Sequence, residues 1–300
     1  MFSPRQLSRG CMALLVWSAA GLLGATPALA EAVAEAGPEV GPKPLVFFAG
    51  LAADRDGGRG VRLGIDYGVA EKTWVTAIGT YSHLSDELSD ITTRSLGAGI
   101  EHSFGRFGVS GNVAYWGDPD EVDSMSFRSS LFYRGGPWRV ALSGERRDVD
   151  VTFRFTNADD IRVQRTEQLQ VDALGGSVSY SGQPWSVRLG HTGYEYSRDP
   201  RPLNFLFRFS VLSASGLTLA NSFLEYRSWA GLEYAFGDRG VFIELSADKG
   251  AVDELRTNTF MLGYYMPIAK RWDMEFQLGV ADTEVLGGAV FGGVTFFLFR

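Results

Sequence analysis

The sequence predicts an all-β protein whose strands close into an antiparallel transmembrane β-barrel of about 14 strands, within a range of 12–16. Three observations predict it. Tight turns recur along the chain, longer polar loops lie between them, and aromatic residues stand on both sides of the turns. A barrel that crosses a bilayer needs turns on one side, loops on the other, and amphipathic rings at the interface.

Six tight turns mark one end of the predicted barrel. They are Glu71-Lys72-Thr73, Gly105-Arg106, Gly135-Gly136-Pro137, Gly182-Gln183-Pro184, Gly237-Asp238-Arg239-Gly240 and Ala269-Lys270-Arg271. Trp74, Trp138, Trp185 and Trp272 directly follow four of these turns, and Phe107 follows a fifth. We expect these aromatic residues to form a belt at one membrane interface, with the four tryptophans at a single depth.

Residues 1–30 are predicted to be a secretory signal peptide. Arg5 and Arg9 form a positive start, Cys11 to Ala25 is a short apolar core, and Ala28-Leu29-Ala30 is a small-x-small cleavage site. Removal of the two arginines takes the net charge from −7 to −9, and removal of Cys11 leaves no cysteine. A secreted chain without disulfides depends on its core or on a closed hydrogen-bonded sheet.

The bulk composition fits a membrane barrel. With 300 residues, 37 glycines and 13% aromatic residues, the chain predicts one large all-β domain. No mature segment is apolar for long enough to predict a transmembrane helix. The mean hydropathy of −0.03 is compatible with barrel strands, which carry apolar residues only at alternate positions. The negative charge gives no support to nucleic-acid binding.

Strands follow an acidic segment, residues 31–43, which contains proline and glycine and is predicted to be a flexible periplasmic leader. The barrel domain then spans 44–300. Alternation of apolar and polar residues predicts strands at 44–53, 60–70, 73–83, 91–104, 107–116, 124–134, 138–154, 161–181, 185–196, 220–236, 240–248, 255–267, 272–282 and 286–299. An even number with both termini at the turn side is the parity of closed bacterial barrels, so we expect both termini in the periplasm.

A secreted soluble β-sandwich would also show alternating strands and turns. It does not explain aromatic residues at the same set of alternate turns, or charges on one face of strand after strand. The pattern therefore favours the membrane barrel.

The last strand adds a resemblance. Gly293-Val294-Thr295-Phe296-Phe297-Leu298-Phe299 looks like the C-terminal targeting strand of bacterial outer-membrane proteins, although Arg300 follows where most members end on an aromatic residue. The mature chain also resembles monomeric fourteen-strand porins in length and hairpin count. This resemblance implies a Gram-negative outer membrane, contacts with its lipids and lipopolysaccharide, recognition by the outer-membrane assembly machinery, and a monomer.

Charged residues recur on the polar face of the predicted strands. A midplane arginine or lysine facing lipid costs about 2–4 kcal/mol, so these side chains must face water or each other. The predicted pore-lining residues are Arg62, Asp66, Arg128, Arg139, Glu145, Arg188, Glu225, Arg227, Glu233, Glu244 and Glu275, and Glu101, Arg147 and Asp273 share these faces.

Two interpretations of this lumen stay open. It is either a water-filled channel whose mixed charges set a weak selectivity, or a network of paired ions that fills the barrel and only stabilises the fold. Eight strands give a filled interior and sixteen to eighteen leave an aqueous channel, so fourteen lies between. We favour an open path. The longest connection, 197–221, would constrict the pore if it folded into the mouth, or would continue a tall strand.

A rival hypothesis is an enzyme that acts on lipids. His83-Leu84-Ser85 is similar to the His-x-Ser of outer-membrane phospholipases and lipid A deacylases, in which the histidine is the general base for a serine nucleophile. No orienting acid or amide on a neighbouring strand can be named, so we expect no catalytic activity. The three scattered histidines make no metal-ligand spacing, the acidic segment 118–123 fails the EF-hand pattern, and no metal or cofactor is expected.

The sequence therefore predicts an outer-membrane porin-like channel for passive or weakly selective diffusion of small hydrophilic solutes. A further alternative is a scaffold or export barrel of an envelope complex. The sequence shows no accessory domain for such a partner.

Overall fold

The computed structural model describes residues 44–55, 57–85, 90–118, 122–156, 162–201, 223–284 and 287–300. The predicted signal peptide and leader lie outside these ranges. The strands are β1 (Leu45–Asp54), β2 (Arg59–Ala70), β3 (Thr73–Ser85), β4 (Asp90–Phe104), β5 (Phe107–Asp118), β6 (Val122–Gly135), β7 (Trp138–Thr156), β8 (Arg162–Gly182), β9 (Trp185–Tyr196), β10 (Leu224–Phe236), β11 (Arg239–Gly250), β12 (Arg256–Ala269), β13 (Trp272–Thr283) and β14 (Gly287–Phe299). No helix in the described ranges is long and apolar enough to cross a membrane.

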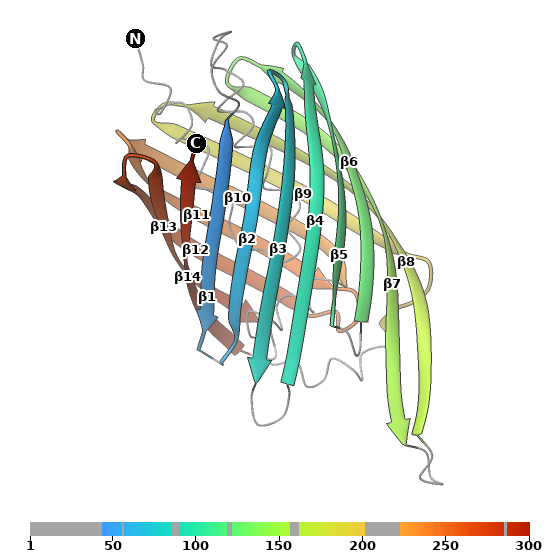
Figure 1. Ribbon diagram of the computed structural model, residues 1–300. Coiled ribbons are helices and arrows are strands. Elements are labelled where there is room, and N and C mark those ends of the chain that lie inside the picture. Colours follow the sequence, from blue (N-terminus) through green and yellow to red (C-terminus); the bar gives the residue numbers. More distant parts are fainter. Residues whose placement is uncertain are drawn as a thin grey trace.

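The fourteen strands form one closed antiparallel barrel (Figure 1). Each strand pairs with its neighbours in sequence, and β1 pairs with β14 from Val46 opposite Phe299 to Asp54 opposite Phe291. The predicted fold class and strand number are confirmed. Because the sheet has no edge, the strands leave no row of backbone N–H and C=O groups without a partner, as a hydrocarbon environment requires.

The barrel has a turn end and a loop end. The turn end carries six two-residue connections, at 71–72, 105–106, 136–137, 183–184, 237–238 and 270–271. Gly105, Gly136 and Gly237 have φ values of 70°, 62° and 72° there, a region that glycine enters freely because it has no Cβ. Leu45 and Arg300 lie at the same end, and the Arg300 N–H donates to the Leu45 carbonyl at 3.0 Å.

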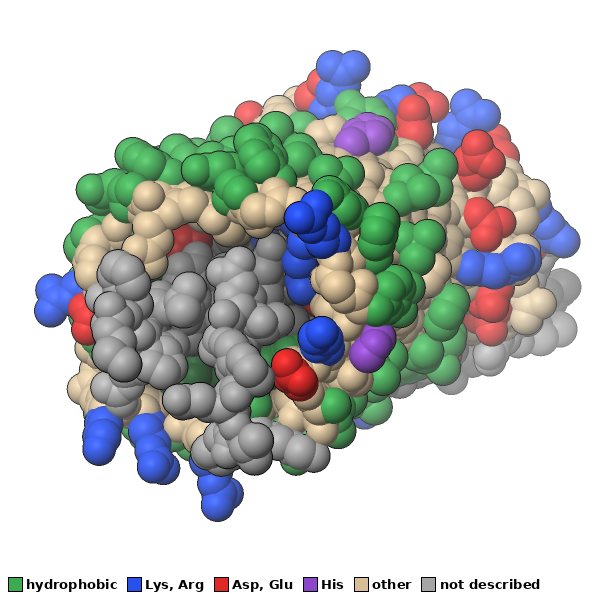
Figure 2. Space-filling model, turned by 90° about the horizontal axis from the view of Figure 1, so that it is seen from above, with side chains coloured by type: hydrophobic (Ala, Val, Ile, Leu, Met, Phe, Trp, Pro, Cys, Tyr) green, Lys and Arg blue, Asp and Glu red, His purple; other side chains and the backbone are tan. Residues whose placement is uncertain are grey.

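The outer wall of the barrel is apolar. Large hydrophobic residues alternate outward along the strands, and Leu63 and Leu278 are 58% and 59% exposed. Figure 2, which looks along the barrel from the turn end, shows hydrophobic side chains along this wall. An apolar surface of this extent on a soluble monomer would be unfavourable in water and marks a lipid contact. The architecture is that of a transmembrane β-barrel.

An aromatic belt surrounds the turn end. Trp138, Trp185 and Trp272 are the first residues of β7, β9 and β13, and all three are exposed on the outer wall, as is Phe107. Rings on neighbouring strands pair along this belt, as Phe107–Tyr133 (5.2 Å between centroids), Trp138–Tyr180 (5.0 Å) and Trp185–Tyr234 (4.6 Å). This arrangement agrees with four of the five aromatic residues predicted for the interface.

Trp74 does not join the belt, which corrects the prediction. β3 begins at Thr73, so Trp74 is the second residue of its strand, whereas the other three tryptophans are first residues. Successive side chains in a strand point to opposite faces, and Trp74 is therefore buried inside the barrel. The face of a residue is determined by its parity within the strand, and a position near the turn does not determine it.

Strands β7 and β8 extend beyond the other strands at the loop end (Figure 1). They have 19 and 21 residues, whereas the next longest strand, β4, has 15. Near this end the inner wall is apolar. We call the group the mouth cluster, and it consists of Val122, Val149, Val151, Leu169, Val171, Phe223 and Val252, with Trp116, Tyr194 and Tyr196 packed against it. Its members come from β5 to β9 and from the residues next to β10 and β11.

A pair of adjacent residues on β11 tests which face meets lipid. Leu245→Arg places a charge on the exposed apolar wall near the middle of the strand and should destabilise the barrel by about 2–4 kcal/mol. The matched control, Ser246→Arg, places the same charge on the inner face and should cost much less. Urea unfolding in lipid vesicles measures both. Equal losses would contradict the assigned faces.

Tryptophan fluorescence tests the belt and its correction. In variants that retain one belt tryptophan, brominated lipids should quench Trp138, Trp185 and Trp272 from a single depth, because all three lie on the outer wall near the turns. A variant that retains only Trp74 should be quenched weakly, since the barrel wall separates its ring from lipid. Strong quenching of Trp74 would refute its inward orientation.

Candidate functional site: the charged lumen

The structure gathers the predicted lining residues on the inner face of the barrel, with one exception. Ten of the eleven share the inward parity of their strands: Arg62, Asp66, Arg128, Arg139, Glu145, Arg188, Arg227, Glu233, Glu244 and Glu275. Their apolar neighbours along the chain point outward. The alternation visible in the sequence therefore sorts charged from apolar residues between lumen and lipid.

Glu225 is the exception, and its prediction was wrong. The register between β10 and β11 shifts between Leu224 and Tyr226, so Glu225 lies in a β-bulge. A bulge adds one residue to a strand and re-aims its side chain. Glu225 is exposed and forms an ion pair with Lys249, the residue that follows the inward-facing Asp248.

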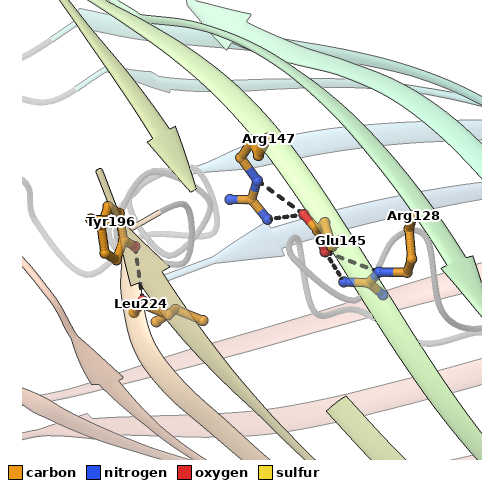
Figure 3. A network of polar contacts seen from close by, with 5 residues as sticks. All are labelled: Arg128, Glu145, Arg147, Tyr196 and Leu224. Atoms are coloured by element: carbon orange, nitrogen blue, oxygen red, sulfur yellow. Dashed lines mark hydrogen bonds and ion pairs between the residues drawn. The ribbon is translucent and has the colours of Figure 1, made fainter. Parts of the chain in front are cut away.

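One carboxylate links two guanidinium groups on the inner face of β6 and β7. Arg128 lies directly opposite Glu145 in the strand register. Glu145 accepts hydrogen bonds from Arg128 Nε at 2.9 Å and from Arg147 Nε and Nη2 at 3.1 and 2.6 Å (Figure 3). Charge-assisted bonds of this kind are among the strongest in proteins. Two cations share one anion, which leaves one positive charge.

A second group nearer the turn end repeats this stoichiometry. Glu101 accepts from Arg134 at 2.9 Å and from Arg139 at 3.2 Å. Both guanidinium groups lie over the ring of Phe132, at 4.6 and 4.2 Å from its centroid. The ring rests on Gly108, where an added Cβ would overlap it. We call the six charged residues of these two groups, on β4, β6 and β7, the basic wall.

Arg227 and Asp248 form a neutral pair. They lie directly opposite each other on β10 and β11, and the guanidinium binds both carboxylate oxygens at 2.8 Å. Both side chains are buried. The bidentate geometry offsets part of the cost of removing two charges from water.

Besides the Arg227–Asp248 pair, five carboxylates and two guanidinium groups lie on the other side of the lumen; Asp273 lies next to the turn end, and the other six lie further in, on β2, β9, β10, β11 and β13. We call these six the acidic wall: Arg62, Asp66, Arg188, Glu233, Glu244 and Glu275. Arg188 reaches over Gly231 to Glu244, with Nη2 2.8 Å from Oε2, and a Cβ at Gly231 would lie 2.8 Å from its Nε. The main opposite charges acting on Arg62 are those of Glu275 and Asp66.

Neutral donors hold three of these carboxylates in place. The Thr76 hydroxyl donates to Asp66 Oδ1 at 2.6 Å, and the Tyr265 hydroxyl donates to Glu233 Oε1 at 2.9 Å. The Gln277 amide donates to Glu275 Oε1. The second oxygen of each carboxylate is buried without a hydrogen-bond partner among the described residues. Such an atom is costly unless water or a ligand reaches it.

The two walls carry opposite net charge. Four guanidinium groups and two carboxylates give the basic wall a formal charge of +2, and two guanidinium groups and four carboxylates give the acidic wall a formal charge of −2, with the carboxylate of Asp273 on the same side nearer the turn end. Strands β4 to β7 and strands β9 to β2 occupy separate arcs of the closed sheet. The lumen therefore has a charge difference across its width.

Sequence reasoning did not name Arg134, Asp248 or Tyr265 as lumen residues. Arg134 shares the parity of Arg128, and Asp248 shares the parity of Glu244. Extending the alternation to the ends of the predicted strands would have found both. Tyr265 was harder to find because its role depends on a contact that crosses β11.

The histidine motif proposed for lipid hydrolysis is only partly described. His83 Nδ1 lies 3.1 Å from Thr92 Oγ1, and its parity is that of the outward-facing Val75 and Tyr81. The side chain of Ser85 lies outside what the structure describes. Within the described ranges, no group of three or more His, Cys, Asp or Glu residues is arranged to hold a metal ion.

The start of the long connection after β9 is fixed by polar contacts. The backbone and Nε N–H groups of Arg201 donate to Asp199 Oδ1 at 3.0 and 2.9 Å and lower the pKa of that carboxyl group. Arg201 also lies 3.5 Å from Glu254 in the next loop, and the Tyr196 hydroxyl donates to the Leu224 carbonyl (Figure 3). The remainder of the predicted loop 197–221, from 202 onward, and residues 119–121 of the acidic segment lie outside the described residues.

Among known proteins, the chain is similar in fold to several solved structures. No family model matches the chain, and no curated protein matches it. Similar solved structures include a loop L8 deletion mutant of OmpT, an outer membrane protein of Vibrio cholerae, with 10% identity and a TM-score of 0.48 over 86% of this chain and 98% of that one. Acinetobacter baumannii OccAB1 has 8% identity and a TM-score of 0.45 over 86% and 96%, and Pseudomonas putida OprB has 6% and 0.46 over 86% and 94%. None of these likenesses assigns a function to this chain.

A double-mutant cycle tests the Arg227–Asp248 pair. Arg227→Ala or Asp248→Ala alone should reduce the free energy of unfolding by about 3–5 kcal/mol, because each leaves a buried charge without its partner. The double variant should cost less than the sum of the two. Urea unfolding in vesicles measures the three values. Additive losses would mean that the pair is not coupled.

Proposed function

We propose that this chain is an outer-membrane porin-like channel through which small hydrophilic solutes diffuse passively or with weak selectivity. The observation that supports this proposal most strongly comes from the acidic wall. There, buried oxygens of Asp66, Glu233 and Glu275 have no hydrogen-bond partner among the described residues. A dry network of paired ions would leave these atoms at a high cost in free energy. Water molecules held beside these oxygens would satisfy them, and the proposal extends this water along the lumen.

Two further features support a narrow path. Fourteen strands enclose an interior wider than that of an eight-strand barrel. Large side chains reach into it from both walls, and the mouth cluster lies on the inner wall near the loop end. We therefore assign small solutes and exclude large ones.

The same proposal includes the location. A signal peptide, a closed barrel and the C-terminal strand Gly287–Phe299 support insertion into the outer membrane of a Gram-negative bacterium by the assembly machinery. The turn end, with both termini of the barrel, would face the periplasm. The chain would act as a monomer, in contact with outer-membrane lipids and lipopolysaccharide.

Conductance in a planar bilayer tests the channel. The purified, folded protein should give discrete ohmic current steps. The lumen pairs most of its opposite charges, so the reversal potential under a salt gradient should show only weak selectivity. A barrel that gives no steps would contradict the channel. If the protein conducts no current but hydrolyses lipid, and His83→Ala abolishes the hydrolysis, the enzyme is supported. If it neither conducts current nor hydrolyses lipid, a scaffold or export barrel is supported.

Charge reversal at Arg62 tests whether the acidic wall meets permeating ions. Arg62→Glu should shift the reversal potential toward cations, because it replaces a positive charge of the wall with a negative one, and it should leave the barrel assembled if water from the lumen hydrates this buried position. Arg239→Glu, an exposed site at the turn end, is the control. Unchanged selectivity with a large loss of thermal stability would mean that paired charges close the lumen.

A further inference from the structure

We propose that the acidic wall is a binding site for a cationic group of the solute, an ammonium or a guanidinium. This inference builds on the proposed channel, since a solute must enter the lumen to reach the wall. It goes further, because it assigns a chemical class of ligand to one arc of the barrel.

Tyr265 joins the two central carboxylates of this site. It lies directly opposite Glu275 in the register of β12 and β13, and its hydroxyl reaches across β11 to Glu233. Glu233 and Glu244 each lie within electrostatic range of Glu275. Glu233 and Glu275 are each 1% exposed, and each keeps one oxygen that no described residue satisfies.

Small residues separate Glu275 from the next charged group. Along one hydrogen-bonded row of the sheet, Glu275 is followed by Thr295 on β14, Gly50 on β1 and Arg62 on β2. A Cβ added at Gly50 would lie 3.0 Å from Thr295 Oγ1. Only a threonine side chain and a glycine hydrogen thus lie on this row between the carboxylate and the guanidinium.

The charge of the wall selects a cation. Arg188 forms an ion pair with Glu244, and Arg62 lies within electrostatic range of Glu275 and Asp66, so this set holds four carboxylates and two guanidinium groups. Like charges held together away from bulk water repel each other, and a cation that enters reduces this repulsion. The basic wall on the opposite arc directs a positive group toward the acidic wall.

The geometry fits an organic cation better than a metal ion. Within the described residues, no group of carboxylates or histidines is arranged to hold a metal. Ammonium and guanidinium groups carry several N–H donors, and they can serve the separated oxygens of Glu233 and Glu275 at the same time.

Calorimetry on the folded barrel in detergent tests this site, with 1,4-diaminobutane as the probe. The diamine should bind, whereas the neutral 1,4-butanediol and the dianion succinate should not. The Glu233→Gln/Glu275→Gln variant should weaken diamine binding by about tenfold or more, because it removes both charges that would accept from the probe. The matched control, Glu195→Gln/Glu225→Gln, removes two exposed carboxylates outside the lumen and should leave binding within about twofold of the wild type.

The wild-type protein alone can overturn the proposal. Diamine binding no tighter than that of butanediol would do so without any variant, as would equal losses in the two double variants. Calorimetry measures binding without any measurement of current. The cation site and the channel can therefore be rejected independently. Ohmic steps without diamine binding reject only the cation site, and diamine binding without steps supports the site while rejecting the channel.

Discussion

The structure depends on the closure of β1 against β14, because backbone N–H and C=O groups cannot stay without partners in hydrocarbon. The register from Val46 opposite Phe299 to Asp54 opposite Phe291 gives each edge strand a second neighbour. Once the sheet is closed, the side chain of each strand residue faces either the lipid or the lumen. The alternation of side chains then decides where each one lies.

Because the outer face of the closed sheet meets lipid, the charged side chains of the strands are confined to the lumen, where they pair across the inner wall. Arginines reach over glycines to carboxylates on the second strand along, as Arg188 does over Gly231 to Glu244. The pairs are incomplete within each arc, so the basic wall keeps an excess of guanidinium groups and the acidic wall an excess of carboxylates. This charge pattern is the basis of our proposal that the lumen selects among small solutes.

The sequence predicted the strands well because two signals agreed over the whole chain. Tight turns set the hairpins, and alternation set the faces, so residues such as Arg62 and Glu275 were assigned to the lumen correctly. It failed at two residues. Glu225 lies in a bulge that changes the parity, and Trp74 was assigned to the belt from its position after the turn instead of from its parity in the strand that begins at Thr73. Pairings were not predictable, because Arg188 and Glu244 meet only through the register of three strands.

The central claim is that the lumen contains water, and thiol labelling tests it most directly. The predicted mature chain has no cysteine, so a single introduced thiol is the only reactive one. Ser130 and Leu131 are adjacent on β6 and face the lumen and the lipid. In folded barrels in vesicles, a small charged methanethiosulfonate should react readily with Ser130→Cys and hardly with Leu131→Cys. A Ser130→Cys thiol that reacts only after unfolding would show a dry, closed interior and contradict the account.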